Sequence, residues 1–239
     1  MLLLDSRKGD GKSHNFSVNY DVPLQLDPTK RYVIGLFSSD IWYSWYNVES
    51  KNNTFRYYNG RVWAKILLQP GAYNITDIDK EIKRLIKVNG DEPDNVSISP
   101  NYNTLKCRVT VSGGYKIDFA QKDSIRTILG FESRTLGTDG TYDGEHNVNI
   151  TDITSLVIRC SLVSGSYING SDSDCIYSFS PNVAPGHLIS IKPYQVLYVP
   201  ISAVTSIPRI TMRITDQSGA EVNLNGEHVT YHLYLKYAD

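Results

Sequence analysis

The feature that most limits how this chain can fold is a strict alternation of apolar and polar side chains near its C-terminus. Over Val229–Tyr237, valine, leucine and tyrosine occupy every second position, and mostly polar side chains lie between them. Successive side chains of a β-strand point to opposite faces, so this pattern predicts a strand with one buried face. The same alternation recurs over Arg209–Thr215, Leu156–Val163 and Leu105–Val111. Such strands bury their apolar faces by packing as sheets in a sandwich or a barrel.

Further segments extend this β pattern. The chain has 17 tyrosines but 2 methionines, a composition that favours strands. The pair Gly113-Gly114 separates Leu105–Val111 from Tyr115–Phe119, and a glycine pair between two strand patterns predicts a hairpin. Five earlier segments are also predicted as strands: Leu2–Asp5, Phe16–Tyr20, Tyr32–Tyr46, Thr54–Tyr58 and Val62–Leu68.

Two segments have the apolar spacing of a helix. In Thr76–Val88 the isoleucines and a leucine share one stripe, with acidic residues first and basic residues last, as the helix dipole favours. Thr76 and Asp79 predict a capping box at its start, and Asn89-Gly90 predicts its end. A shorter helix is predicted over Ile125–Leu129, with Gly130 as its stop.

Strand patterns before and after these helices predict the fold class: all-β, a single jelly-roll β-sandwich with a small inserted α/β segment. We expect one domain over residues 1–239, which its 239 residues allow, and an insertion at about 70–131 that carries one good helix and one short helix. The Gly- and Asp-rich stretch Gly137–Glu145 is predicted to be a mobile loop.

Charge and hydropathy exclude several classes of partner. The 24 basic and 25 acidic side chains leave a net charge of −1, without the basic cluster that binding to a nucleic-acid backbone requires. No stretch is apolar for the roughly 20 residues that a membrane span needs, and none has the pattern of a signal peptide. We therefore expect no specific nucleic acid, no membrane insertion and no secretion. Three widely separated cysteines offer neither a disulfide framework nor a metal knuckle.

The motifs that suggest chemistry are weak. His228 and His232 share one face of an alternating strand, which fits a surface pair better than two metal ligands, and no third ligand is evident. Asp172 and Asp174 lie in a turn that lacks the spacing of a calcium loop. No nucleophile, base and orienting group can be assembled from spacing. We therefore expect no catalytic residue, no cofactor, no metal and no enzymatic activity.

The most unusual segment is Ile41–Tyr46, with the sequence IWYSWY. In a strand, Tyr43 and Trp45 point one way while Trp42 and Tyr46 point the other, so large aromatic side chains occupy both faces. Either the insertion covers the second face or a neighbouring subunit does, because aromatic residues are enriched at protein interfaces. Trp42, Tyr43, Trp45 and Tyr46 are therefore candidate subunit-interface residues.

The order of a series of short motifs resembles a known family, the minor capsid (penton) proteins of Polinton, or Maverick, elements and of the related adintoviruses and virophages. Each motif is short, so the resemblance rests on their order across most of the chain. The motifs are Pro70–Ile75, Ile117–Phe119, Ser124-Ile125, Ile128–Phe131, Ser164–Gly170, Tyr177–Val183, Pro185-Gly186, Lys192-Pro193, Leu197–Ile201 and Ile214–Gln217.

This resemblance implies a single jelly roll, five copies of which close an icosahedral vertex beside a separate double-jelly-roll major capsid protein. It implies a homo-pentamer located in the virion and assembled inside the host cell, and it implies no enzyme.

Two other function classes stay open at this point. A glycan- or receptor-binding β-sandwich would use exposed aromatic rings, with Trp42, Trp45 or Trp63 in a groove. A metal-dependent enzyme of cupin type would need a stoichiometric metal.

Overall fold

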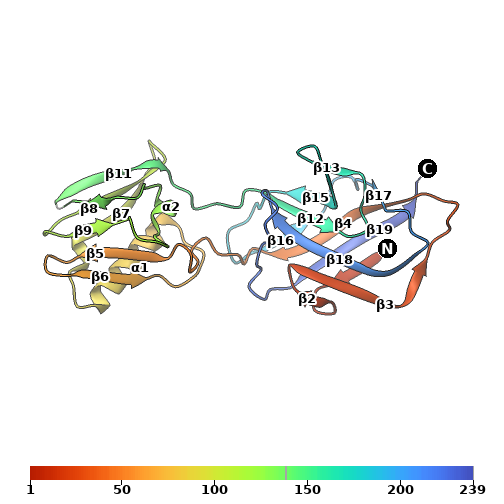
Figure 1. Ribbon diagram of the computed structural model, residues 1–239, viewed down its shortest axis with the longest axis horizontal. Helices are drawn as coiled ribbons and strands as arrows, with labels where there is room; N and C mark the ends of the chain where they lie inside the picture. Colours follow the sequence, from red (N-terminus) through yellow and green to blue (C-terminus); the bar gives the residue numbers. More distant parts are fainter. Residues whose placement is uncertain (138, 239) are drawn as a thin grey trace. The chain divides into compact units, whose positions relative to one another are not determined.

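The computed structural model describes residues 1–137 and 139–238, and the chain folds as two compact units, each with its own hydrophobic core (Figure 1). The sandwich unit comprises residues 1–45 and 153–239, and the inserted unit comprises residues 46–152. The segment expected as an insertion, about 70–131, lies within the inserted unit. That unit also contains the strands predicted over Thr54–Tyr58 and Val62–Leu68, because their apolar side chains belong to its separate core.

The sandwich unit consists of two antiparallel sheets. The first sheet has the order β1-β19-β4-β16, and β17 also pairs with β4. Its strands are β1 (Leu2–Asp5), β19 (Val229–Tyr237), β4 (Tyr32–Trp42), β16 (Leu188–Ile191) and β17 (Val199–Pro200). The second sheet has the order β15-β12-β18-β3-β2. Its strands are β15 (Cys175–Phe179), β12 (Leu156–Cys160), β18 (Ser206–Asp216), β3 (Asn15–Gln25) and β2 (Asp10–Lys12).

The connections between these strands define a jelly roll. The chain crosses from one sheet to the other at β1–β3, β3–β4, β4–β12, β15–β16, β16–β18 and β18–β19, whereas β12 and β15 are neighbours in one sheet. Two four-stranded sheets wound in this way, β1-β19-β4-β16 and β3-β18-β12-β15, have the jelly-roll topology. The expected all-β jelly-roll fold is therefore confirmed, and the inserted unit occupies the β4–β12 connection.

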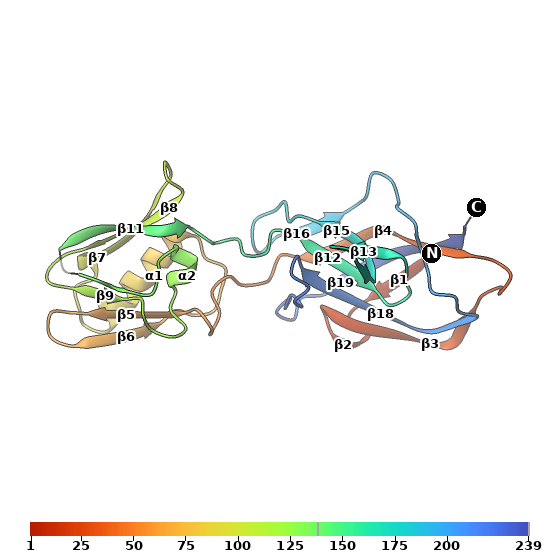
Figure 2. The same cartoon turned by 45° about the horizontal axis from the view of Figure 1, so that its top comes forward.

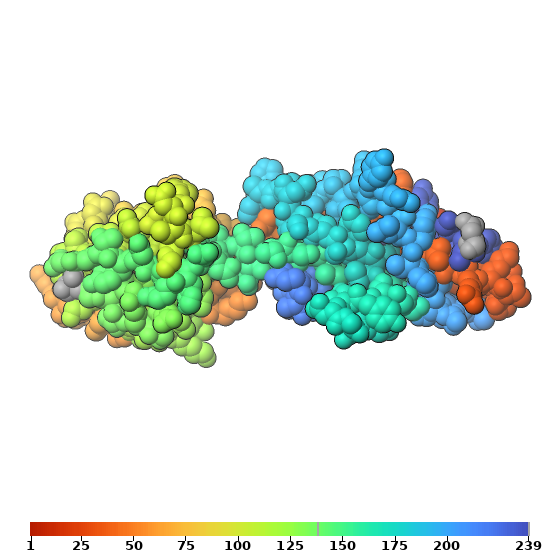
Figure 3. Space-filling view, turned by 90° about the horizontal axis from the view of Figure 1, so that it is seen from above, coloured from red at the N-terminus to blue at the C-terminus, as the bar shows by residue number. Residues whose placement is uncertain are grey.

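The alternation at the C-terminus places β19 as predicted. Its residues Val229, Tyr231 and Leu233 are buried in the sandwich core, where the Tyr231 ring stacks on Phe16 from the opposite sheet with 6.1 Å between ring centroids. Two features project from this unit: the loop after β16, and a hairpin of β13 (Ser166–Ile168) and β14 (Ser171–Ser173) (Figures 2 and 3).

The inserted unit combines two small sheets with helices. One sheet has the order β10-β9-β5-β6, with strands β10 (Thr135–Leu136), β9 (Lys116–Asp118), β5 (Thr54–Tyr58) and β6 (Trp63–Leu67). The other has the order β11-β8-β7, with strands β11 (Gly140–Asn147), β8 (Lys106–Val111) and β7 (Val96–Asn101). The helices are α1 (Ile75–Val88), the short α2 (Arg126–Leu129) and a 3-10 turn, η1 (Pro93–Asn95).

Helix α1 buries the stripe that its sequence predicts, namely Ile78, Ile82 and Ile86. Its N-terminal cap differs from the prediction. Asn74, not Thr76, is the cap, and its Oδ1 atom accepts a 2.8 Å hydrogen bond from the backbone N–H of Asp77. An asparagine two residues earlier satisfies a free N–H group of the first turn equally well, so Thr76 is included in the helix.

The hairpin predicted at Gly113-Gly114 is wrong. Both glycines have positive φ angles, 63° and 76°, and do turn the chain. However, β8 pairs with β7 on one edge and with β11 on the other, so β9 joins the β10-β9-β5-β6 sheet, between β5 and β10. A period-two pattern specifies which face of a strand is buried, but not which strand becomes its neighbour.

The loop predicted over Gly137–Glu145 is largely a strand. Residues 140–147 form β11, and Thr138 lies outside the described residues. Tyr142 packs against the core, and the Arg108 guanidinium donates hydrogen bonds of 2.7 and 2.8 Å to both oxygens of Asp143. Cross-strand contacts thus stabilise a segment whose glycine and aspartate content is typical of a loop.

Two glycines in the inserted unit allow a matched test of local packing. Gly90 and Gly130 both have positive φ, 82° and 76°, but a Cβ atom at Gly90 meets nothing, whereas at Gly130 it would press on the carbonyl oxygens of His146 and Asn147. We expect Gly90→Ala to cost about 1–2 kcal/mol from backbone strain alone. Gly130→Ala should cost about 1–3 kcal/mol more because of the clash. Urea unfolding followed at 222 nm measures both, and equal losses would contradict this packing.

Candidate subunit interface

The aromatic segment after β4 divides into a buried pair and an exposed pair. The strand predicted to reach Tyr46 ends at Trp42, but the two-sided arrangement of the rings persists. Tyr43 and Trp45 stack with 4.0 Å between ring centroids, and Trp45 is only 6% exposed, inside the sandwich core. Trp42 and Tyr46 remain 39% and 40% exposed.

Backbone contacts from two loops of the sandwich unit fix this segment. The Tyr43 N–H donates to the His187 carbonyl at 2.9 Å, and the Tyr43 carbonyl accepts from the Gly186 N–H at 2.8 Å. On the other side, the Ser44 hydroxyl donates to the Leu224 carbonyl at 2.6 Å. Burial raises the pKa of the Tyr43 phenol, which therefore stays neutral. Tyr43 and Trp45 thus belong to the core, while Trp42 is held at the surface in a fixed orientation.

The outer face of the first sheet carries further exposed apolar side chains. Leu188 pairs with Trp42 across β16 and β4 and is 43% exposed. Phe37 is also 43% exposed and contacts Tyr234 edge-on at 4.9 Å, and Leu3 on β1 is 59% exposed. We call Leu3, Phe37, Trp42 and Leu188 the apolar residues of this face. Polar side chains such as Asp40 and Ser190 lie between them.

The outer face of the second sheet is different in kind. Its polar side chains satisfy one another: Ser17 is hydrogen-bonded to Thr211 at 2.8 Å and accepts from Arg209 at 2.7 Å. The carboxylate of Asp174 accepts hydrogen bonds from both Arg159 and Arg213, at 2.8 and 2.6 Å.

The pKa of Asp174 is affected by these hydrogen bonds. Burial opposes ionisation of this carboxyl, but the hydrogen bonds from the two guanidinium groups outweigh it and lower its pKa. A partner that docked on this face would have to desolvate groups already paired within the chain. The first sheet offers apolar area without that penalty, so its outer face is the better candidate for contact between subunits.

Among the described residues there is no group of three or more His, Cys, Asp or Glu side chains that could hold a metal ion. His232, one of the pair weighed above, lies opposite Leu3 and Ser38 in the first sheet. No helix of the described chain is long and apolar enough to cross a membrane.

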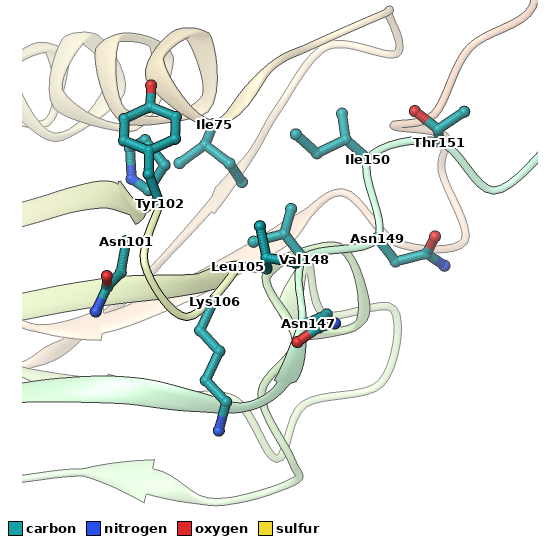
Figure 4. Close-up of a pocket in the computed structure, with 11 residues that line it drawn as sticks. Ile75, Asn101, Tyr102, Leu105, Lys106, Asn147, Val148, Asn149, Ile150 and Thr151 are labelled. Carbon is teal, nitrogen blue, oxygen red and sulfur yellow. The ribbon is translucent and has the colours of Figure 1, made fainter.

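The inserted unit contains an open pocket of about 380 Å³ beside the start of α1 and the β7–β8 turn (Figure 4). Its walls are mainly apolar, from Ile75, Leu105, Val148 and Ile150, with Lys106 as its cation. The described lining includes no carboxylate, imidazole or thiol, and its titratable side chains are Tyr102 and Lys106.

Comparison with known proteins reveals a likeness of fold. No protein-family profile matches the chain, and no curated protein matches its sequence. Among solved structures, the mavirus penton protein superposes with a TM-score of 0.50 at 12% sequence identity, covering 99% of this chain and 98% of that one. A chain of the Sputnik virophage, solved by cryo-EM, gives a TM-score of 0.40 at 13% identity, with 98% and 96% coverage. The chain therefore shares its fold with the mavirus penton protein over nearly their whole lengths.

Substitution at the two tryptophans distinguishes core from surface. We expect Trp45→Ala to lower the free energy of unfolding by about 3–5 kcal/mol, because it removes a buried indole and the ring beneath Tyr43. Trp42→Ala should cost about 1 kcal/mol or less, since much of its ring already contacts water. Chemical denaturation of both variants at low protein concentration, which disfavours association between copies, measures the difference. Comparable losses would mean that Trp42 is a core residue.

Proposed function

We propose that this chain is a minor capsid (penton) protein that forms the five-fold vertices of an icosahedral shell. The observation that carries the proposal is the near-complete mutual coverage with the mavirus penton protein, which extends over the jelly roll and the inserted unit alike. Two unrelated sandwiches would share strands, but they would have no reason to share an insertion of this size and placement. The ordered motifs that resemble the Polinton, adintovirus and virophage pentons support the same assignment.

In this proposal the protein acts by assembly and not by catalysis. Five copies associate with one another, and the resulting vertex contacts a separate major capsid protein of the double-jelly-roll type. The protein is a component of the virion, assembled inside the host cell.

A ring of five requires heterologous contacts, in which one surface of each copy meets a different surface of the next. Trp42 and Tyr46 supply exposed aromatic anchors for such a contact, and the neighbouring Tyr43 and Trp45 rings stack on each other. Aromatic side chains dominate the energy of protein interfaces because they bury large areas with few rotatable bonds. We propose that the contact uses this segment together with the apolar residues of the first sheet.

The mass of the assembly in solution tests this proposal. Native mass spectrometry should give a species of five times 26.9 kDa, and the double variant Trp42→Ala/Tyr46→Ala should give a folded monomer. The matched control is Tyr167→Ala/Tyr194→Ala, which removes two rings elsewhere in the sandwich unit, one on β13 and one on the loop after β16, that are 70% and 107% exposed. This control should still form the ring. A wild-type chain that stays monomeric at high concentration would contradict a ring built by the isolated protein.

A further inference from the structure

The outer face of the β10-β9-β5-β6 sheet in the inserted unit has an unusual composition. Phe55 and Tyr57 of β5 are buried. Because side chains alternate along a strand, Arg56 and Tyr58 point to the opposite, outer face. The register then places Trp63 opposite Tyr58 on β6, and it places Lys116 opposite Tyr58 on β9. Asp118 of β9 lies opposite Arg56 on the same side. We call the outward aromatic and basic residues the aromatic–basic face: Arg56, Tyr58, Trp63, Lys65 and Lys116.

The rings and the cations of this face contact one another. The rings of Tyr58 and Trp63 lie 5.5 Å apart, centroid to centroid, with their planes tilted by 52°. The guanidinium of Arg56 sits 4.7 Å from the Trp63 ring, and the ammonium of Lys116 sits 5.7 Å from the Tyr58 ring. Trp63 is 39% exposed. The result is a pair of aromatic rings, Trp63 exposed and Tyr58 half-buried, with a positively charged group beside each ring.

The one acidic side chain in these strands does not neutralise the face. Asp118 pairs with Arg56 at 2.8 Å and also accepts from the side-chain amide of Gln121 at 2.7 Å. Burial opposes ionisation of Asp118, but these hydrogen bonds, with one from the backbone of Ala120, lower its pKa. Among the described residues, no carboxylate lies within ion-pair distance of Lys65 or Lys116. Two lysines therefore remain uncompensated beside the rings.

The other sheet of the same unit shows that such a face is not a general property of this fold. On the outer face of the β11-β8-β7 sheet, Arg108 is paired through two hydrogen bonds with Asp143, and Thr110 is hydrogen-bonded to Thr141 at 3.2 Å. Those polar side chains therefore form hydrogen bonds with one another within the chain. The aromatic–basic face instead presents apolar rings and positive charges to solvent, an arrangement that favours a ligand with an apolar surface and negative charge.

We infer that the aromatic–basic face binds an acidic saccharide, that is, a sugar chain bearing carboxylate or sulfate groups. The C–H surface of a pyranose ring can lie on the exposed ring of Trp63 and extend to the half-buried ring of Tyr58, because aromatic side chains combine an apolar body with tolerance of water. Lys116 on β9 and Lys65 on β6 lie on either side of the central strand β5 and meet the acidic substituents. Compact ammonium groups suit isolated anionic groups.

A saccharide fits these observations better than a nucleic acid. Binding a strand through its phosphates depends on a series of cations along the backbone and on a positive field that draws the strand in. This chain has a net charge of −1, and its uncompensated cations on this face are few and lie close to one ring pair. That charge arrangement matches one or two acidic sugars.

Binding of defined probes to the full-length protein tests the inference. Immobilised heparin hexasaccharide and 3′-sialyllactose carry sulfate and carboxylate groups respectively, lactose carries neither, and a short oligo-dT provides the nucleic-acid alternative. We expect at least one acidic saccharide to bind about tenfold or more tightly than lactose and oligo-dT. The two acidic probes distinguish a preference for sulfate from one for carboxylate.

Two variants and their matched controls locate the binding surface. Trp63→Ala and Lys65→Gln/Lys116→Gln should each weaken binding of the acidic probe about tenfold or more. Lys87→Gln/Lys106→Gln removes the same charge from other surfaces of the inserted unit, and Tyr102→Ala removes a ring that is 82% exposed elsewhere. These controls should change affinity less than about twofold. Unchanged ellipticity at 222 nm verifies that each variant is folded.

Three results would overturn the inference: no binding of either acidic saccharide, tighter binding of oligo-dT than of the saccharides, or equal losses in the lysine control and in Lys65→Gln/Lys116→Gln. The third result would mean that net charge alone draws the probe. None of these outcomes bears on ring formation, because the aromatic–basic face belongs to a unit with a separate core.

Discussion

Strand β4 is the element on which the rest of the sandwich depends. On one edge it pairs with β19 from Tyr32 to Ile41, and on the other it pairs with β16 and β17. Its inward residues Ile34, Leu36 and Ile41 form the floor of the core, and its last residue, Trp42, begins the aromatic segment. After β4 the chain continues through this segment into the inserted unit. Core packing, the candidate interface and the insertion therefore all depend on the register of one strand.

The two units have separate cores, and their surfaces differ. The sandwich unit keeps its second sheet polar and internally hydrogen-bonded, and it leaves apolar side chains on the outside of the first sheet. The inserted unit has a core of its own, so its surface can change without loss of the jelly roll. The chain enters and leaves the inserted unit at adjacent points, since the Asn47 side-chain amide donates to the carbonyl of Ile150 at 3.0 Å. An insertion anchored in this way adds a surface to the sandwich without opening its sheets.

The sequence predicts much of this architecture because side-chain periodicity reports burial directly. The strand Val229–Tyr237, the buried stripe of α1 and the division of the aromatic segment into two faces all follow from spacing alone. Spacing does not identify a strand's neighbours, which is why β8 and β9 were expected to pair and do not. It also underrates segments such as β11, whose stability comes from Tyr142 and from the Arg108–Asp143 pair across the sheet. The aromatic–basic face could not be predicted either, because it depends on the pairing of β5 with both β6 and β9.

The central claim is that the sandwich unit, with the adjoining Tyr46, carries the contacts proposed to build the vertex, and removal of the rest of the inserted unit tests it most directly. A chain in which a short Gly/Ser linker replaces residues 47–152 keeps Tyr46 and connects Trp45 to Ile153, both of which pack on the sandwich core. Its mass in native mass spectrometry should be the same multiple of its subunit mass as that of the full chain. A folded but monomeric sandwich, formed by a variant of a full chain that is itself pentameric, would contradict the account and assign the subunit contacts to the inserted unit.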